Sequence, residues 1–492
     1  MSQSVKRDKL FWGSCLALLT TAFAFTVISG IAFSIKQEFI LTNAQLGVFT
    51  GVFFIGFTIS QVIFSPLCDT IGMRWIVRGA FVGHVAGALL IMTAQGYELA
   101  VAGSLCCGLG AGLVEAGCNP LVAALYPDNK TAKLNHFHMW FPYGNLIAAL
   151  ILTLIFQQLG LGWRTQLILI LLPAAGYGVM MYTEHFPPTE GVSAGVSVGQ
   201  TFKALFAPIM LVMMPMMLLT ASMELPPSAW VPPVLEAGGV NGLLVFGFVF
   251  GIMGTLRLLA APVVRALTPT GILLAGSILA TVGLYLFSFA ETTLMTFATA
   301  AIWAVGIAYF WPTMLGFVSE RNPKSGALGL GVMGAIGMLA SFMVTPWLGN
   351  VADEKGHSQL PVEETVRVLE DVMAQFPGIA ETAGAREQDI LAVAGTAEDV
   401  LTTYANDGAL PVGVTAQALR AVTTSGADSP VVQQAGEILN PADNYGGRNS
   451  FRTLAPYGLI LVFVFGILFI RDRLAGGYKA TSLSTDQHAG DG

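Results

Sequence analysis

The chain has 492 residues, of which 54% are hydrophobic and 11% are charged, and its mean hydropathy is +0.68. This composition excludes a soluble globular protein of this length and predicts a protein embedded in a lipid bilayer. The net charge of −7 has a local origin, because fifteen of the thirty acidic residues lie between residues 350 and 453. The sequence contains no phosphate-binding loop, zinc motif or nucleophile elbow, so ATP-driven transport, a metal site and enzymatic catalysis have no support.

A membrane-spanning helix needs about 20 predominantly apolar residues. Twelve such runs occur, six on either side of a polar linker at 184–203: 10–35, 45–68, 75–94, 98–126, 134–159, 163–183, 204–229, 242–264, 270–290, 293–318, 326–349 and 454–470. We therefore expect an all-α integral membrane protein with two pseudo-symmetric six-helix halves. Its parts would be an N-terminal half (1–183), the linker, helices seven to eleven (204–356), an extramembrane insertion (357–453), and helix twelve with a tail (454–492).

The distribution of Lys and Arg over the short loops predicts the orientation, because cytoplasmic loops are enriched in both. With the N-terminus inside, fourteen basic residues fall on the cytoplasmic side, whereas the short outer loops hold only Lys36 and Arg164. We expect a multi-pass plasma membrane protein, in a bacterial inner membrane, with both termini cytoplasmic. The linker would then be cytoplasmic and the insertion would lie outside.

The insertion is predicted to be a small helical domain. In "VEETVRVLEDVMAQF", Val362, Val366, Leu369, Met373 and Phe376 recur at helical spacing. In "DSPVVQQAGEIL", Ser429 is a candidate N-cap and Pro430 stands at the first helical position. Two interpretations stay open: a tolerated loop insertion with no role in transport, or a domain that binds a partner.

The two halves show a weak internal repeat when Asn119-Pro120 is laid on Trp311-Pro312. Repeated halves are typical of secondary transporters, whose sites lie near mid-membrane between the repeats. The stretch "SPLCDTIGMR" resembles the signature G-x-x-x-D-R-x-G-R-R of the major facilitator superfamily, with Asp69, Gly72 and Arg74 at matching positions. This resemblance implies a cytoplasmic gate built on these three residues.

A narrower resemblance lies on helices four and five. "EAGCNP" and "LNHFHMWFPYG" are similar to the fucose–proton symporter branch, in which an acid, Asn-Pro, Leu-Asn and a Gly recur. The resemblance implies sugar transport driven by protons. That branch also carries an acid in the first helix, and "CLALLTTAFAFTVISG" has none.

Glu115 is the leading candidate for coupling. A carboxylate inside a membrane helix costs about 2.5–3.5 kcal/mol on insertion scales and usually faces a cavity or a partner. Burial favours its neutral form, which would let Glu115 take up a proton on one side and release it on the other. Asn119 lies on the same face at i+4, and Pro120 leaves the carbonyl of Ala116 free to face a cavity. The alternative is a structural acid tied to Asn119.

Two further charges stand inside predicted helices. Glu224 precedes Pro226-Pro227, which are expected to break helix seven near its outer end, so it is a second coupling candidate at an outer gate or an interfacial acid in contact with water. Arg257 either extends its side chain to the cytoplasmic interface or pairs with an acid across the cavity.

His138, Phe141 and Asn145 form one stripe on helix five, and Trp311 lies in an aromatic group on helix ten. With Asn119 they are the candidate substrate-binding residues. Aromatic faces beside amide and carboxylate groups suit a sugar ring, although single aromatics in membrane helices are more often packing residues.

We expect a secondary transporter that works by alternating access and takes a sugar or polyol together with protons. It would need no cofactor, only an H⁺ or Na⁺ gradient, and its partners would be the small-molecule substrate and the bilayer, with no nucleic acid. We expect a monomer. The alternatives are transport or export of an organic acid, nucleoside or drug, and a receptor or scaffold that no longer transports. An anionic substrate would need a buried cation, for which Arg257 is the candidate.

Overall fold

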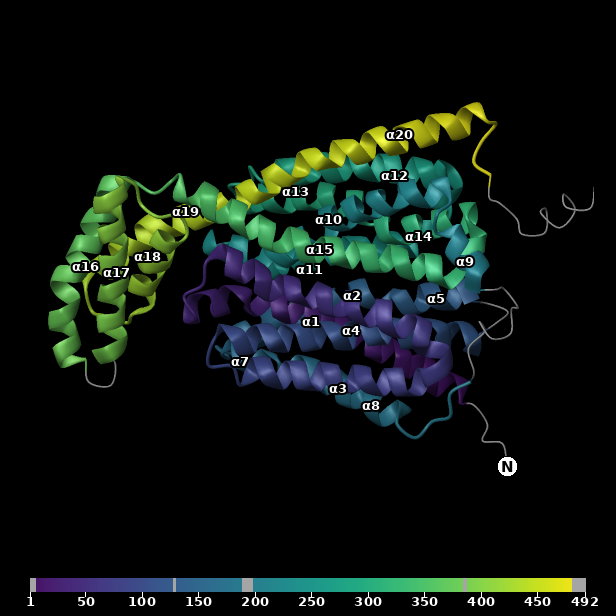
Figure 1. Cartoon of the computed structure of the whole chain (residues 1–492), viewed down its shortest axis with the longest axis horizontal. Helices are drawn as coiled ribbons and strands as arrows, with labels where there is room; N and C mark the ends of the chain where they lie inside the picture. Colours follow the sequence, from purple (N-terminus) through teal and green to yellow (C-terminus); the bar gives the residue numbers. More distant parts are fainter. Residues whose placement is uncertain (1–5, 127–129, 188–197, 384–386, 480–492) are drawn as a thin grey trace, which may run out of the picture.

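The apolar runs of the sequence fold into long helices in the computed structural model, which describes residues 6–126, 130–187, 198–383 and 387–479. Eleven helices of the described chain are long and apolar enough to cross a membrane, and the shorter apolar helix Gly242–Leu258 stands at the eighth predicted span. Each of the twelve expected spans therefore has its helix. Figure 1 shows them side by side, with the insertion at one end and the end of the last helix, α20 (Gly458–Leu474), at the other. We call these the insertion end and the terminal end.

The N-terminal half begins with four uninterrupted helices, α1 (Arg7–Glu38), α2 (Asn43–Ile71), α3 (Met73–Met92) and α4 (Tyr97–Leu125). Its fifth span is composite: α5 (Lys130–His138), α6 (Trp140–Ile151) and a π-helical turn, η2 (Leu152–Gln157). The sixth span consists of α7 (Trp163–Gln166) and α8 (Ile168–Met181).

The second half follows α9 (Val198–Ala204) and contains α10 (Pro208–Ala237), α11 (Gly242–Leu258), α12 (Ala260–Phe287), α13 (Thr293–Ile307), α14 (Phe310–Arg321), a 3₁₀ turn η3 (Pro323–Ser325) and α15 (Gly326–His357). Within α12, Thr268 has φ 62° and ψ 160°, so the helix kinks there before Pro269. Its first turns continue the eighth span, and the remainder is the ninth.

Glycines allow the helices to approach closely. A Cβ at Gly108 or Gly112 of α4 would collide with the backbone of Phe53 or Phe57 in α2. A Cβ at Gly47 of α2 would lie 2.7 Å from the Cα of Pro346 in α15, across the boundary between the halves. Small residues at such crossings are a common way to pack helices in membranes.

The insertion is a helical domain, as expected, made of α16 (Val362–Thr382), α17 (Glu387–Asp407), α18 (Val414–Thr424) and α19 (Pro430–Leu454). Its core includes Leu369, Phe376, Ile390 and Leu419. The Ser429 side chain accepts a hydrogen bond from the backbone N–H of Val431, which confirms the predicted N-cap.

Two details of the insertion differ from the sequence prediction. Val362 and Met373 are exposed, because the buried face of α16 is centred on Val368, Leu369 and Val372 instead. The domain also has no loop before the last span: α19 passes through the 3₁₀ turn η5 (Ala455–Tyr457) directly into α20 (Gly458–Leu474). The last span and the insertion thus share one helical stretch of 45 residues, Pro430–Leu474, whose apolar part is the last span.

Candidate functional site

Glu115 lies on α4 in a small polar group that we call the Glu115 cluster, formed by Glu115, Asn119 and His138. Asn119 Nδ2 donates to Glu115 Oε2 at 2.6 Å, one helical turn away, as the i+4 spacing predicts. His138 Nδ1, at the end of α5, lies 3.9 Å from Glu115 Oε1. The side chains of Glu115 and His138 are 15% and 41% exposed. The carboxylate is therefore held by neutral or titratable partners and is within reach of water.

Pro120 and Pro312, the two prolines of the internal repeat, each leave one backbone carbonyl without its helical donor. Both carbonyls accept a hydrogen bond from a neighbouring helix. Pro120 has no N–H for Ala116 O, which instead accepts from Cys68 Sγ of α2 at 3.5 Å. In the second half Pro312 frees Ala308 O, which accepts from Arg257 Nε of α11 at 2.9 Å. The expectation that Ala116 O faces a cavity was wrong, because the neighbouring helix supplies a donor.

Glu224 and Arg257 meet inside the second half. Arg257 Nη2 lies 3.6 Å from Glu224 Oε1, and the Glu224 side chain is only 4% exposed. Glu224 Oε2 has no hydrogen-bond partner among the described residues. Of the two interpretations of Arg257, the geometry thus supports pairing with an acid, which is Glu224.

The expected helix break beside Glu224 was wrong. Helix α10 continues through Pro226-Pro227 to Ala237, which places Glu224 in its middle and not near an end. The Met223 carbonyl, whose helical donor Pro227 removes, accepts from the indole Nε1 of Trp303 at 3.0 Å. In a membrane protein a neighbouring helix can satisfy such a carbonyl, so the helix tolerates the proline.

The other predicted binding residues differ in exposure. Phe141 is half-buried, and its ring lies 6.3 Å from Phe25 of the first half and 6.2 Å from Phe250 of the second. Asn145 is 0% exposed, and its amide is occupied by Thr26 Oγ1 at 2.8 Å and by the Phe141 carbonyl. This environment fits a role of Asn145 in packing α1 against α6.

Trp311, on α14, is half-buried and packs against Gly337 of α15. A Cβ at Gly337 would lie 2.9 Å from Cζ3 of its indole ring. The indole is thus placed by a contact that only a residue without a side chain permits.

The predicted cytoplasmic gate is described in part, because the side chain of Asp69 lies outside the described part of the chain. Gly72 joins α2 to α3 with φ +86°, a conformation that favours glycine. Arg74 Nη2 donates to Tyr182 O at 3.1 Å, and Arg78 Nη2 donates to the same carbonyl at 2.7 Å. These two arginines tie α3 to the end of α8 within one half.

A polar network at the insertion end was not predicted. It joins Lys36 of α1 and Arg420 of α18 to the carboxylate of Asp443 in α19. Lys36 was noted only as one of two basic residues on the expected outer side. The contact between Lys36 and Asp443 joins residues 407 positions apart, and periodicity in a single sequence gives no signal at that separation.

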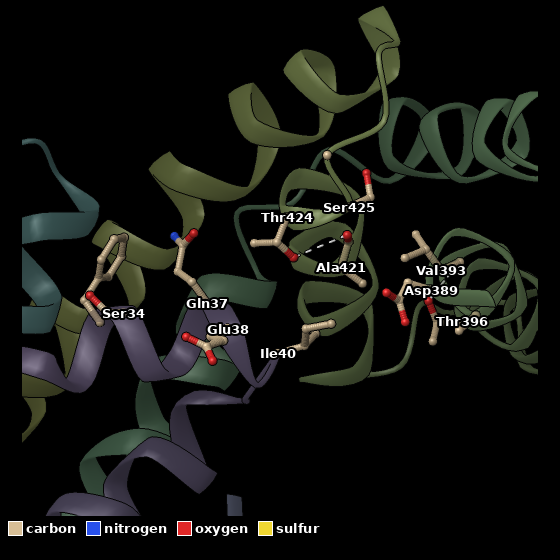
Figure 2. A pocket seen from close by; sticks show the side chains of 13 residues that line it. Ser34, Gln37, Glu38, Ile40, Asp389, Val393, Thr396, Ala421, Thr424 and Ser425 are labelled. Carbon is tan, nitrogen blue, oxygen red and sulfur yellow. Dashed lines mark hydrogen bonds between the residues drawn. The ribbon is translucent and has the colours of Figure 1, made fainter. Parts of the chain in front are cut away.

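An open groove of about 840 Å³ lies beside this network, between the last turns of α1 and helices α17 and α18. Figure 2 shows Ser34, Gln37 and Glu38 on one side and Asp389 and Thr424 on the other. Glu38 is already held by Trp163 Nε1 and Arg164 Nη2, both at 2.6 Å. The groove thus lies between α1 and the insertion, next to the place where the two are in contact.

Comparison with known proteins identifies the family. Residues 14–345 match the sequence model of the Major Facilitator Superfamily. The chain belongs to this superfamily. It is thus a multi-pass membrane transporter and not an enzyme, and the matched residues end before the insertion.

The similar curated proteins are transporters, matched over short regions. Polyol transporter 5 of Arabidopsis thaliana is 27% identical over 143 residues, which are 29% of this chain and 26% of that protein. Hexose transporter HXT13 of Saccharomyces cerevisiae is 30% identical over 19% of this chain and 16% of its own length. The MFS-type efflux pump MMF1 of Mycosarcoma maydis is 29% identical over 25% of this chain and 20% of its own.

Solved structures confirm the fold. A bacterial homolog of the human lysosomal transporter Spinster, in an inward-facing and unoccupied conformation, has a TM-score of 0.67 at 15% identity, covering 96% of this chain and 99% of its own. A D-xylose–proton symporter has a TM-score of 0.58 at 18% identity, covering 69% and 89%. The expected twelve-helix architecture in two halves is the architecture of this fold.

Proposed function

We propose that the transporter imports a sugar or polyol together with protons by alternating access, and that Glu115 carries the proton. The supporting observation is the Glu115 cluster, in which a half-buried carboxylate inside a span is paired with an amide and a histidine. Such a group can change its protonation state without leaving a permanent charge unpaired. The insertion end is placed outside the cell and both termini in the cytoplasm, following the distribution of basic residues.

Glu224, the second coupling candidate, is less suited to this role. Proton binding to its carboxylate would leave the half-buried guanidinium of Arg257 without its countercharge. The same pairing weakens the case for an anionic substrate, since Arg257 is the buried cation that such a substrate would need. We therefore place Glu224 and Arg257 in the framework of the second half.

The sugar or polyol assignment is supported by the polyol and hexose transporters among the similar proteins. Phe141 and Trp311 offer half-buried aromatic faces, and Asn119 and His138 offer hydrogen-bonding groups for hydroxyls. Asn145 is left out of the proposed binding surface, because its amide is buried and occupied.

The test measures external pH while sugars and polyols are added one at a time to lightly buffered, de-energised cells at low sodium. Alkalinisation with one compound is expected, and its absence in Glu115→Gln, with counterflow exchange preserved, would assign the proton to Glu115. Wild-type accumulation by Glu115→Gln would contradict the coupling role. A sodium-dependent response would replace the proton with Na⁺.

Export is the second candidate, favoured by the similarity to an efflux pump. Everted membrane vesicles would distinguish the directions. Import predicts that a pH gradient, acidic inside the vesicle, drives the sugar out of preloaded vesicles. Export predicts accumulation of substrate in the vesicle in exchange for protons.

A further inference from the structure

The insertion contacts the short connection between α1 and α2. Arg420, on α18, is 2% exposed, and its Nη1 donates to the carbonyl of Leu41 at 2.7 Å. Gln417, one turn earlier, donates through Nε2 to the carbonyl of Ile40 at 3.1 Å. Side chains of the insertion thus satisfy two consecutive carbonyls of a loop that belongs to the other half of the protein.

Ile40 supplies an independent indication that this contact holds the loop in place. Its φ is +51°, in the left-handed region where a β-branched residue is strained. Its side chain packs against the core of the insertion. Strain of this kind persists only where the surroundings fix the backbone, and here the surroundings are the insertion.

Buried charges reinforce the contact. The carboxylate of Asp443, on α19, accepts from Arg420 Nη2 at 2.5 Å and from Lys36 Nζ at 2.8 Å. The side chains of Lys36 and Asp443 are only 5% and 9% exposed. Because the three charges are shielded from water, loss of one partner leaves the others unpaired at a substantial cost.

A second acid of the same side holds the start of α2. Asp353, near the end of α15, accepts from the backbone N–H groups of Asn43 at 3.0 Å and Ala44 at 2.9 Å. These are free N–H groups of the first turn of a helix, where a carboxylate is favourable. The insertion end of the N-terminal half is thus fastened from α15, α18 and α19 together.

The insertion packs against helices of the second half. Gly446 of α19 packs against the backbone of Ala352 and Gly356 in α15. Asn444 Nδ2 donates to the carbonyl of Val234 in α10 at 3.1 Å. Contacts from this base to Lys36 and Leu41 therefore bridge the two halves that must separate when this end opens.

We propose that the insertion is a clasp on the outer gate, with Arg420 and Asp443 as its positioning residues. They hold the α1–α2 connection against the second half while the insertion end is closed, and they release it when that end opens. The inference rests on the alternating-access part of the proposed function, and it is independent of the substrate and of the coupling ion.

The test measures the distance between spin labels at the insertion end in the full-length protein without substrate. Leu159 and Leu294, which are 67% and 80% exposed, serve as label sites on the two halves, with the five native cysteines replaced. A pair at Val179 and Leu474, 78% and 84% exposed, reports on the terminal end.

The test variants are Arg420→Gln and Asp443→Asn, and the matched control is Arg367→Gln on the exposed face of α16. Each test variant should raise the ratio of open to closed molecules at the insertion end at least about tenfold, with a shortened distance at the terminal end. Arg420→Lys, which keeps the charge, should shift the ratio less. A merely structural defect would broaden both distance distributions without this reciprocal change, and that result would overturn the proposal.

Gly47→Trp separates the two possible failures, because the nearest atoms that a side chain there would meet belong to Thr345 and Pro346 of α15, so it should force the halves apart at a helix contact outside the insertion. If Gly47→Trp opens this end and the insertion variants keep the wild-type distances, the clasp is refuted and alternating access stands. If Gly47→Trp also keeps the wild-type distances, alternating access falls and the clasp falls with it.

Discussion

The two halves supply different hydrogen-bond donors to a backbone carbonyl that a proline leaves without its helical partner. In each, a proline in the fourth helix frees a carbonyl, and the second helix of that half supplies the donor: the thiol of Cys68 to Ala116 O, and the guanidinium of Arg257 to Ala308 O. The weak donor accompanies an acid, Glu115, that has a neutral amide and a histidine beside it. The strong donor accompanies an acid, Glu224, that has a fixed countercharge.

This difference teaches that a buried acid is not by itself a coupling site. Its partners decide whether the acid can bind or release a proton without removing the countercharge of a permanently charged residue. Four substitutions break or sharpen the contrast, and they are ordered by their expected effect on stability.

Arg257→Met should have the largest effect, because it leaves Glu224 buried without a countercharge. We expect a loss of about 3–5 kcal/mol in the free energy of unfolding. The measurement is the midpoint of thermal or denaturant unfolding in detergent. The double variant Arg257→Met with Glu224→Leu should recover most of the loss, and a double variant as unstable as the single one would contradict the pairing.

Trp303→Phe should have the next largest effect. It keeps an aromatic ring but removes the N–H that satisfies the Met223 carbonyl freed by Pro227. A buried carbonyl without a partner costs about 1–3 kcal/mol. The same unfolding assay checks this, with Trp12→Phe, at a 46% exposed position, as the matched control. Equal stability of the two variants would mean that Met223 O needs no donor.

Glu115→Gln should be a mild change for the fold and a severe one for transport. The Gln side chain keeps an oxygen to accept from Asn119 Nδ2, so we expect a loss below about 1 kcal/mol. Uphill accumulation should nevertheless disappear. Unfolding measured on the same preparation as transport separates the two effects, and a misfolded Glu115→Gln protein would place Glu115 in the framework with Glu224.

Cys68→Ala should have the smallest effect. A thiol is a weak donor, and its hydrogen bond to Ala116 O has a length of 3.5 Å. We expect a change of no more than about 0.5 kcal/mol and transport close to wild type. A loss as large as that of Arg257→Met would show that the two freed carbonyls depend equally on their donors, and the contrast between the halves would disappear.

The spans were predictable because each is a long apolar run, and the helix α19 was predictable from Ser429 and Pro430. The continuation of α10 past Pro226-Pro227 was not predictable, because these prolines, considered alone, indicate a helix break. Only the hydrogen bond from Trp303 to Met223 O shows why the helix continues. The Glu115–Asn119 bond follows from i+4 spacing. The partners of Glu224, Lys36 and Asp443 depend on helices distant in sequence, so their pairing required the fold.

The continuous passage from α19 into α20 has a practical consequence. At 1.5 Å per residue, a stretch of 45 residues is about 68 Å long, roughly twice the hydrocarbon thickness of a bilayer. The helical domain is therefore joined to the membrane part by one helical stretch, and excising the domain would cut this stretch next to the twelfth span. For electron cryo-microscopy, this connection gives a small transporter a fixed landmark outside the micelle, by which single-particle images can be aligned.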